Sequence, residues 1–369
     1  MKYLVFLFLG FLFSCKSEKS MDIRNVSDVL PIDSSVTVKV TGEKLPLDLL
    51  NPLSILCIDT MLLVYQHFEE LMVKAYGVES GQMLGAFLRK GGGPDEVSMF
   101  NGFTQSFYDG QDPQIVIQSY PQYIGILDLN ETLKSQKVIY KKKYSFVDNE
   151  RNSLFASSNI AFSLYKDVFL LTKAPERSGR LEDGNTYFEL YDYGKNEVLK
   201  SFYATDLPFI PNAFELYKGS LTLKEDREKI ALFMRFMPVF SITDIESGVS
   251  KQFFPFGKEE NLQKYIDIPG HYYWSAYSTT DRIVALYKGG VDPLAIEDES
   301  LHSYFHIFDW NGRLLYKIEV EDNIKCISLN GKTGDVYAVL MNDEIKRYSL
   351  EQYLRSYLDD KSCDNEYLY

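Results

Sequence analysis

The chain has 369 residues and a formal net charge of −13, with 45% hydrophobic and 25% charged residues. This acidity argues against a nucleic-acid partner, because phosphates attract a basic surface. The hydrophobic and charged fractions are those of a globular protein rather than of a disordered one. Aromatic residues are in excess, with 27 Tyr and 25 Phe, and both types favour β-strands. The composition therefore predicts an all-β protein with a sizeable core.

The first fifteen residues have the pattern of a lipoprotein signal. Lys2 precedes an apolar stretch over residues 3–13, which is too short to anchor the chain as a membrane-spanning helix. Ser14 then places a small residue directly before Cys15. The chain thus resembles a bacterial lipoprotein precursor, in which residues 1–14 are removed and Cys15 becomes lipidated. Several acyl chains on one residue hold a protein on a membrane almost permanently.

The segment that follows Cys15 predicts a tether and a location. Residues 15–34 comprise this cysteine and a polar stretch that would join the lipid to the folded domain. We expect the lipid to anchor the protein to the outer membrane on its periplasmic side. The segment is not strongly acidic, so it does not support display on the cell surface, although it leaves such display open.

Three cysteines remain after Cys15, namely Cys57, Cys326 and Cys363. Cys57 and Cys326 lie in strand-like segments, which favours buried thiols. A disulfide between these two stays open, because connectivity cannot be deduced from a sequence. No cysteine and histidine spacing in the chain predicts a zinc site.

One unit, a strand followed by a turn and a returning strand, recurs five times after residue 35. The five hairpins are expected at residues 73–83, 125–133, 188–198, 240–249 and 305–314. Their equivalent turn positions are Gly77, Asp128, Asp192, Asp244 and Asp309, which are 51, 64, 52 and 65 residues apart. Each interval accommodates four short strands, which is the content of one propeller blade.

A sixth copy of the unit is incomplete. Residues 335–340 and 344–350 predict two strands, but residues 351–361 then predict a short amphipathic helix instead of a returning strand. Residues 36–40 predict a strand that has no blade of its own. We expect this strand to fill the outer place in the last blade and so close the ring. The sequence therefore predicts a six-bladed β-propeller over residues 35–350, followed by a C-terminal helix and tail over residues 351–369.

The segment Arg89–Val97 (RKGGGPDEV) follows the last strand of the first expected blade. A basic residue, a glycine run and a Pro-x-Glu sequence at this place resemble the signature of the TolB-like six-bladed β-propeller lipoproteins. The resemblance implies the propeller fold and a secreted or periplasm-facing location in a Gram-negative bacterium. It implies no catalytic residues.

The residues of this segment also allow an interpretation of their own. Glycines suit a turn with positive φ between two blades, and Pro94, Asp95 and Glu96 suit the first turn of a short helix. A structural turn is the favoured interpretation. The functional interpretation is that the crossing carries Glu96 to the mouth of the central channel, where it would contact a ligand.

The densest group of polar aromatic residues lies in residues 270–277 (GHYYWSAY). Exposed Tyr273 and Trp274 would stack on sugar rings or grip a peptide, and His271 would serve as an acid or a base. These three residues are therefore candidates for ligand binding. The competing interpretation is an inner strand whose aromatic side chains pack between blades, which the aromatic-rich composition favours.

Metal binding is not expected at the obvious histidine pair. His302 and His306 lie in a strand-like segment, where four residues span about 13 Å, too far for one ion. The acidic residues 292–300 lack the ligand pattern of an EF-hand, so a solvated loop is favoured while calcium stays open. Residues 141–143, three lysines, predict a solvated strand edge, and residues 177–184 predict an exposed hairpin tip.

We therefore expect a non-catalytic binding module for a protein, peptide or glycan of the cell envelope, without a resident cofactor. The alternative is a calcium-dependent propeller enzyme, similar to a lactonase or a lyase, with its site in the central channel. Such an enzyme predicts carboxylates that repeat at the starts of the inner strands, and the sequence lacks this pattern. A purely structural scaffold is a third class, which predicts a large apolar patch on the outer surface.

Overall fold

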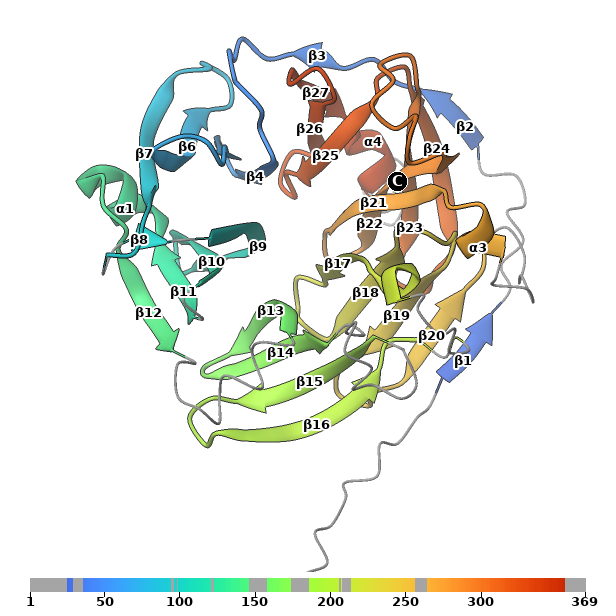
Figure 1. Ribbon diagram of the computed structural model, residues 1–369, viewed down its shortest axis with the longest axis horizontal. Helices are drawn as coiled ribbons and strands as arrows, with labels where there is room; N and C mark the ends of the chain where they lie inside the picture. Colours follow the sequence, from blue (N-terminus) through green and yellow to red (C-terminus); the bar gives the residue numbers. More distant parts are fainter. Residues whose placement is uncertain are drawn as a thin grey trace, which may run out of the picture.

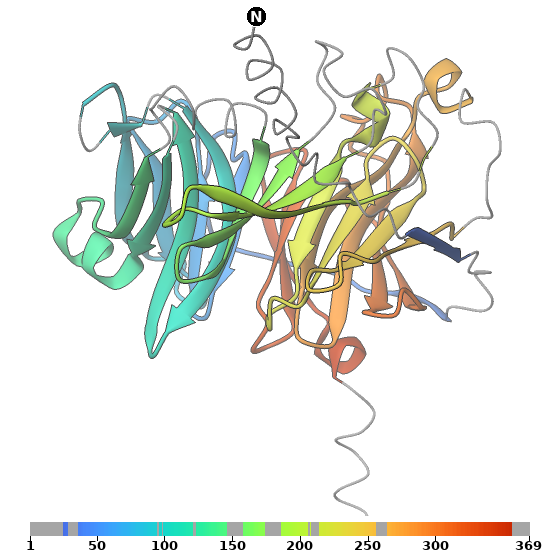
Figure 2. The same cartoon turned by 90° about the horizontal axis from the view of Figure 1, so that it is seen from below.

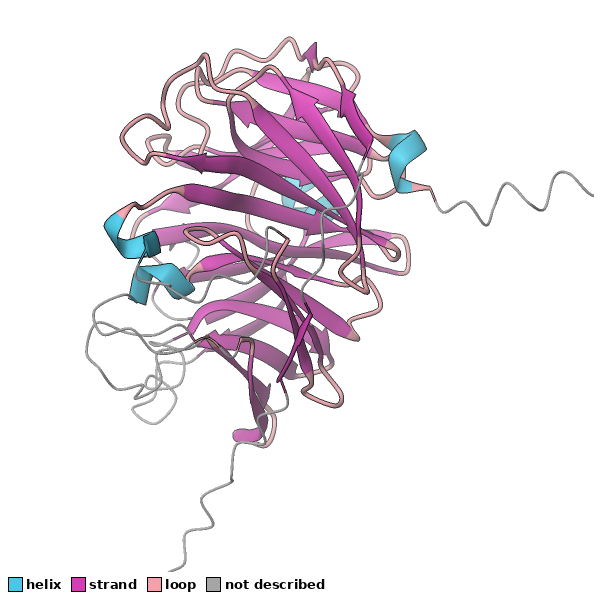
Figure 3. Ribbon diagram, turned by 90° about the vertical axis from the view of Figure 1, so that its right-hand side faces the viewer, coloured by secondary structure: helices cyan, strands magenta, loops and turns pink. Residues whose placement is uncertain are grey.

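The computed structural model describes residues 25–28, 36–93, 96–97, 99–120, 123–145, 158–173, 186–205, 207, 214–255 and 264–355. Within these residues the β-strands form six sheets, which are arranged as blades around a common centre (Figure 1). The chain is therefore a six-bladed β-propeller, as the sequence predicted. Strands make up its body, and the short helices lie at its margins (Figure 3).

The first three blades follow one another along the chain, each with its first strand innermost. Blade 1 contains β4 (Ser54–Ile58), β5 (Met61–Tyr65), β6 (Leu71–Gly77), β7 (Met83–Lys90) and β8 (Glu96–Val97). Blade 2 contains β9 (Met99–Asp109), β10 (Asp112–Tyr120), β11 (Tyr123–Asp128) and β12 (Tyr140–Ser145), with helix α1 (Leu129–Ser135) before its last strand. Blade 3 contains β13 (Ser158–Tyr165), β14 (Val168–Lys173), β15 (Tyr187–Asp192) and β16 (Glu197–Tyr203).

The other three blades each gain one strand from the N-terminal part of the chain. Blade 4 contains β17 (Gly219–Leu223), β18 (Lys229–Met234), β19 (Phe240–Asp244), β20 (Ser250–Phe253) and β1 (Asn25–Asp28). Blade 5 contains β21 (His271–Ser278), β22 (Arg282–Val291), β23 (Ser303–Asp309), β24 (Leu314–Val320) and β2 (Val36–Lys39). Blade 6 contains β25 (Ile324–Leu329), β26 (Asp335–Leu340), β27 (Ile345–Ser349) and β3 (Glu43–Lys44). The remaining short helices are η1 (Phe214–Tyr217), α3 (Lys264–Asp267) and α4 (Glu351–Leu354).

The N-terminal strands run along the outer edges of three successive blades (Figure 1). β1 pairs in parallel with β20 and β2 with β24, whereas β3 pairs antiparallel with β27. The prediction that residues 36–40 close the last blade is therefore wrong, because β2 lies on blade 5 and the two residues of β3 close blade 6. Arg347 of β27 forms an ion pair with Glu43 at 2.6 Å, which helps so short a strand to stay in place. Residues 25–28, which were expected to belong to the tether, form β1.

The repeated aspartates close turns at one end of the blades. Asp192 and Asp244 each accept a hydrogen bond from the backbone N–H three residues on, at 3.0 and 2.7 Å. Asp309 accepts two, from the N–H groups of Asn311 and Arg313, both at 2.9 Å. The repeat therefore marks side chains that satisfy the backbone of each turn.

Asp128 has the same role but begins a different structure. It is the N-cap of α1, and its carboxylate accepts a hydrogen bond from the N–H of Glu131 at 3.0 Å. The simple hairpin predicted at residues 125–133 is therefore wrong, because the helix is inserted between β11 and β12. The reason is local, since a capping aspartate followed by residues that favour helix satisfies the exposed N–H groups of a first helical turn.

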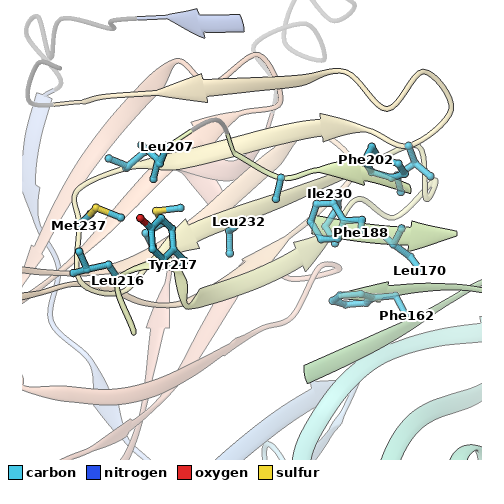
Figure 4. Packing of buried hydrophobic residues seen from close by; sticks show 14 of the residues in the cluster. Phe162, Leu170, Phe188, Phe202, Leu207, Leu216, Tyr217, Ile230, Leu232 and Met237 are labelled. Carbon is cyan, nitrogen blue, oxygen red and sulfur yellow. The ribbon is translucent and has the colours of Figure 1, made fainter. Parts of the chain in front are cut away.

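In the described residues the core consists of six clusters of buried apolar side chains, each lying between two neighbouring blades. Figure 4 shows the cluster between blades 3 and 4, where Phe188 of β15 and Ile230 of β18 belong to one packed layer. The cluster between blades 6 and 1 contains Leu45, Ile55 and Ile345. Because every blade buries both of its faces, the ring is held together by the same kind of contact at each junction.

Two smaller predictions are confirmed by the packing. Lys141 to Lys143 lie exposed on β12, the outer strand of blade 2, and Lys141 and Lys142 form ion pairs with Asp128 and Asp167. Cys57 and Cys326 are free thiols, of which Cys57 is buried and Cys326 is partly exposed, and burial raises the pKa of both to about 12.

Other predictions are met in part or lie outside the described residues. The C-terminal helix is present as α4, which is shorter than the predicted range of residues 351–361, and residues 356–369 are not described. Cys15 with the rest of the signal segment, and the predicted hairpin tip at residues 177–184, also lie outside. No helix in the described part of the chain is both long enough and apolar enough to span a membrane.

Candidate functional site

The propeller has two ends, which differ in the segments that they carry (Figure 2). At the crossover face the chain passes from one blade to the inner strand of the next, and the second and third strands of each blade are joined. At the turn face lie α1, α4 and the turns closed by aspartate. The crossover face includes residues 45–53, 66–70, 235–239, 268–270, 292–302, 321–323 and 341–344. Segments that are held at the end of a rigid ring are well placed to carry recognition.

His271 and Trp274 meet at the crossover face of blade 5. The two rings are stacked, with centroids 4.8 Å apart and planes inclined by 23°. The pairing of β21 with β22 shifts in register on both sides of Tyr273, so that side chains three residues apart in a strand can share one side. Phe236, from the turn between β18 and β19, contacts the same imidazole with centroids 5.0 Å apart. We call Phe236, His271 and Trp274 the aromatic group.

Two cations lie against this group. The Arg235 guanidinium carbon is 5.4 Å from the centroid of the Trp274 ring, and Lys288 Nζ is 5.5 Å from it. Both distances fall within the range of a cation–π interaction. Lys288 comes from β22 and only 2% of its surface is exposed. Together with the aromatic group, these two residues form what we call the cationic-aromatic site.

The electrostatics of the site follow from burial. Burial lowers the pKa of Lys288 to about 7. The pKa of His271 is also lowered, first by burial and then by the charges of Arg235 and Lys288. The imidazole is therefore uncharged near neutral pH. Among the described residues, the charges that act on His271 are those of two cations, Arg235 and Lys288, whereas the net charge of the chain is −13.

Neutral polar groups hold Lys288 in place. Its Nζ donates hydrogen bonds to Ser303 Oγ, at 3.1 Å, and to Asn323 Oδ1. The Asn323 side chain in turn donates to the backbone oxygens of Ile296 and Asp298, both at 2.7 Å. Asn323 therefore links the buried ammonium to the acidic loop of blade 5 and to the start of blade 6.

That acidic loop is built as a series of turns. Asp292 accepts a hydrogen bond from the N–H of Leu294 at 2.8 Å, and Asp298 accepts from the N–H and the hydroxyl of Ser300. These contacts agree with the interpretation of a solvated loop. In the described residues, no group of three or more His, Cys, Asp or Glu side chains could hold a metal ion.

The strand spacing predicted that His302 and His306 of blade 5 do not share one metal site, and the structure places them apart. His306 is buried and stacks on Tyr287 with centroids 4.3 Å apart, and burial lowers its pKa to about 3. His302 is exposed, and its Nδ1 lies 3.0 Å from a carboxylate oxygen of Glu319.

The other candidates from the sequence lie elsewhere. Tyr273 is fully buried among the side chains between blades 4 and 5, and its ring lies 5.1 Å from that of Phe233. The packing interpretation therefore describes Tyr273, and its role in ligand binding stays a prediction that no contact supports.

Glu96 lies in β8, at the outer edge of blade 1, where its backbone pairs with Arg89. Its carboxylate accepts a hydrogen bond from the N–H of Gly93 at 2.9 Å, and a Cβ on Gly91 would overlap it. Glu96 therefore lies in a strand, with its carboxylate bonded to the backbone N–H of Gly93, and not in the helical turn that the sequence predicted. Pro94 and Asp95 are not described. A ligand contact by Glu96 stays a prediction.

Sequence reasoning missed Arg235, Phe236 and Lys288. One sequence signal pointed to Lys288, because this lysine directly follows five apolar residues of a strand (IVALY). No sequence pattern pointed to Arg235 and Phe236, since they follow a buried strand as ordinary turn residues do.

Comparisons with known proteins support the fold alone. No protein-family model matches the chain, and no curated protein matches it. The crystal structure of a member of the DUF4221 family from Bacteroides vulgatus has a TM-score of 0.52 at 10% identity, over 85% of this chain and 92% of that one. The resemblance to TolB-like proteins therefore stands as one of fold, that of a six-bladed propeller.

Two more distant likenesses carry no argument about this chain. The WD40 repeats of RRP9 have a TM-score of 0.44 at 11% identity, over 81% of this chain and 79% of that one. Raptor of Chaetomium thermophilum has a TM-score of 0.49 at 9% identity, over 84% of this chain but only 29% of that one.

Proposed function

We propose that this chain is a lipid-anchored binding module of the bacterial cell envelope, which binds a protein, peptide or glycan at its crossover face. The observation that carries the proposal is the aromatic group, in which Phe236 and Trp274 stay partly exposed on a rigid ring. Aromatic side chains that are already held in place bind with little loss of conformational freedom. The propeller fold supports a binding or scaffold role in general, and the aromatic group favours binding at this place.

The anchoring part of the proposal rests on Cys15. Asn25, the first residue of β1, follows Cys15 by only ten positions in the sequence. At a maximal extension of about 3.5 Å per residue, this tether keeps blade 4 within about 35 Å of the membrane. We place the protein on the periplasmic side of the outer membrane, with surface display as the other orientation.

A comparison of alanine variants tests the binding site. The full-length chain, purified in detergent, is applied to arrays of glycans and peptides. We expect a bound ligand whose affinity falls about tenfold or more in Trp274→Ala. The control is Tyr165→Ala at the turn face, where the side chain is 57% exposed and the substitution should leave binding unchanged. Ligands that bind Trp274→Ala and the unmodified chain equally well would disprove this site.

A separate experiment tests the anchor. Cys15→Ser should abolish incorporation of labelled palmitate and move the protein from the membrane fraction to the soluble one, because a single residue carries the acyl chains. Labelling that persists in the variant would show that another residue is modified or that the proposed signal is not used.

A further inference from the structure

We infer that the turn face of blades 1 and 2 lies on the phospholipid bilayer to which Cys15 is attached. This inference rests on the proposed lipid anchor, and it leaves the crossover face open to a partner. Three exposed apolar side chains and two exposed lysines gather around helix α1 at this end of the ring. We call these five residues, Met83, Leu84, Ile139, Lys134 and Lys137, the basic apolar patch.

The apolar part of the patch is built where α1 of blade 2 packs against β7 of blade 1. A Cβ on Gly85 would lie 3.2 Å from a methyl carbon of Leu133, so this leucine of α1 lies on the backbone of β7. Leu84 directly precedes Gly85 and is 45% exposed, and Met83 is 56% exposed. Ile139 follows α1, is hydrogen-bonded to it through its N–H, and is 38% exposed.

The lysines of the patch stand beside these apolar side chains. Lys134 lies in the last turn of α1, and Lys137 comes two residues before Ile139. Lys134 pairs with Glu131 at 3.4 Å, but both side chains are exposed, so this pair is weak. Lysine stems can lie along an apolar surface while their charges reach the phosphates of lipid headgroups. Exposed apolar side chains with cations beside them are typical of a protein surface that lies in a membrane interface.

The crossover face also exposes apolar side chains, but acidic residues accompany them. Each of its four most exposed apolar residues lies within two positions of a carboxylate, namely Leu50 near Asp48, Phe68 near Glu69, Ile268 near Asp267 and Leu294 near Asp292. The negative potential of a membrane that contains anionic lipids repels carboxylates and attracts lysines. The basic apolar patch is therefore the exposed apolar surface whose neighbouring charges fit a bilayer.

The position of the tether agrees with this orientation. Asn25, the first residue of β1, pairs with Ser250, which comes directly after the turn between β19 and β20. The tether therefore meets blade 4 near the turn face, and the crossover face lies beyond the other end of β20. On blade 3, between this point and the patch, Tyr165 is 57% exposed and precedes the exposed Lys166. A chain of about 35 Å at most can thus bring this side of the ring onto the bilayer.

Quenching of tryptophan fluorescence by brominated lipids tests the orientation. Both natural tryptophans, Trp274 and Trp310, are replaced by Phe. One tryptophan is then introduced by Leu84→Trp or, as the matched control at the crossover face, by Leu294→Trp. Each full-length lipidated protein is placed in nanodiscs of phosphatidylglycerol and phosphatidylcholine with brominated acyl chains. We expect at least about threefold stronger quenching in Leu84→Trp, because an interfacial side chain enters the bilayer by about 5–10 Å.

Charge variants test the part that the lysines play. In the Leu84→Trp protein, Lys134→Glu combined with Lys137→Glu should lower the quenching about twofold or more, and raised salt should lower it as well. Lys39→Glu is the control, because this lysine is 67% exposed at the crossover end of β2, and it should leave the quenching unchanged. Thermal melting checks that each variant is folded.

The remaining outcomes separate this inference from the proposed function. Equal quenching at the two positions, or stronger quenching in Leu294→Trp, would overturn the orientation and leave the lipid anchor standing. No quenching in either protein, with labelled palmitate present on Cys15, would do the same. Dimers of the Cys15→Ser chain that Leu84→Ser disrupts would assign the patch to a second copy and overturn its contact with lipid. A chain that carries no lipid would overturn the anchor and this inference together.

Discussion

Lys288 is a buried basic residue in a protein whose net charge is −13. Its stem lies within β22, and among the described residues its ammonium donates hydrogen bonds to two neutral acceptors, Ser303 and Asn323. The bonds to Asn323 place the ammonium at the junction of blades 5 and 6. The charge is therefore held where it acts on His271 and Trp274, and it costs stability when it is present.

Because the folded-state pKa of Lys288 is about 7 and the unfolded one is about 10.4, the unfolded chain binds more protons between these values. The contribution of Lys288 to the free energy of unfolding therefore rises with pH across this window. Lys288→Met lacks this contribution. From about pH 7.5 to 9.5, we expect the stability difference between the variant and the unmodified chain to shift by about 2 kcal/mol in favour of the unmodified chain.

Urea unfolding of both proteins at the two pH values measures this shift. Tyrosine titration affects the two proteins equally and cancels in the difference. Lys134→Met, on the exposed surface of α1, is the matched control and should show a constant difference. A difference between Lys288→Met and the unmodified chain that does not change with pH would contradict a buried, uncompensated ammonium.

At the scale of single elements, the blades are shaped by the turns that join their outer strands. Asp244 accepts hydrogen bonds from both the N–H and the hydroxyl of Ser247, at 2.7 Å each. These bonds contribute to a pKa for Asp244 that is lower than its usual value, against the opposing effect of its burial. The aspartate thus does in the turn what a capping residue does at the start of a helix.

Asp244→Ala should lower the free energy of unfolding by about 1 to 2 kcal/mol, because the turn loses its side-chain acceptor. Asp244→Asn should recover about half of this loss, since its amide oxygen can still accept. Asp281→Ala, an exposed aspartate in the turn between β21 and β22, serves as the control and should stay within about 0.5 kcal/mol. Equal stability of Asp244→Ala and Asp281→Ala would show that the repeated aspartate is not structural.

The blades could be predicted from the sequence because their signals are local. Each repeated aspartate and its flanking strands lie within about ten residues, so the pattern that identifies a turn is also what forms it. The closing strand could not be predicted in the same way. β3 has only two residues, and β2 alternates in a pattern that fits any open sheet edge, so the blade that each joins depends on tertiary contacts.

The candidate site was predictable only where its residues share a strand. His271 and Trp274 both belong to β21 and were identified from their composition. The register shifts that turn Tyr273 into the core depend on the pairing of β21 with β22, which the sequence does not display. Arg235 follows β18 and Lys288 lies within β22, so only the folded ring brings them to the Trp274 indole.

At the scale of the whole molecule, the ring is closed by contacts between its first and last blades. Leu45 follows β3 directly, donates its N–H to the backbone oxygen of Ile345 at 2.9 Å, and is buried in the cluster between blades 6 and 1. Closure of this kind covers sheet surfaces and edges that an open array would leave exposed.

Leu45→Ala should lower the free energy of unfolding by about 2 to 4 kcal/mol, because the cavity that it leaves lies at the closing junction. Leu50→Ala is the matched control, five residues on in the same segment, since the side chain of Leu50 is 76% exposed against 6% for Leu45. Urea unfolding followed by circular dichroism measures both. A loss for Leu45→Ala no larger than that for Leu50→Ala would contradict closure at this junction.

The central claim is that the ring carries a solvent-accessible, positive aromatic site on its crossover face. Collisional quenching of Trp274 in the full-length Trp310→Phe chain tests this claim without any assumption about the ligand. Iodide should quench Trp274 more strongly than caesium, although the net charge of −13 would favour caesium over most of the surface. Stronger quenching by caesium, or no quenching by either ion, would contradict the account.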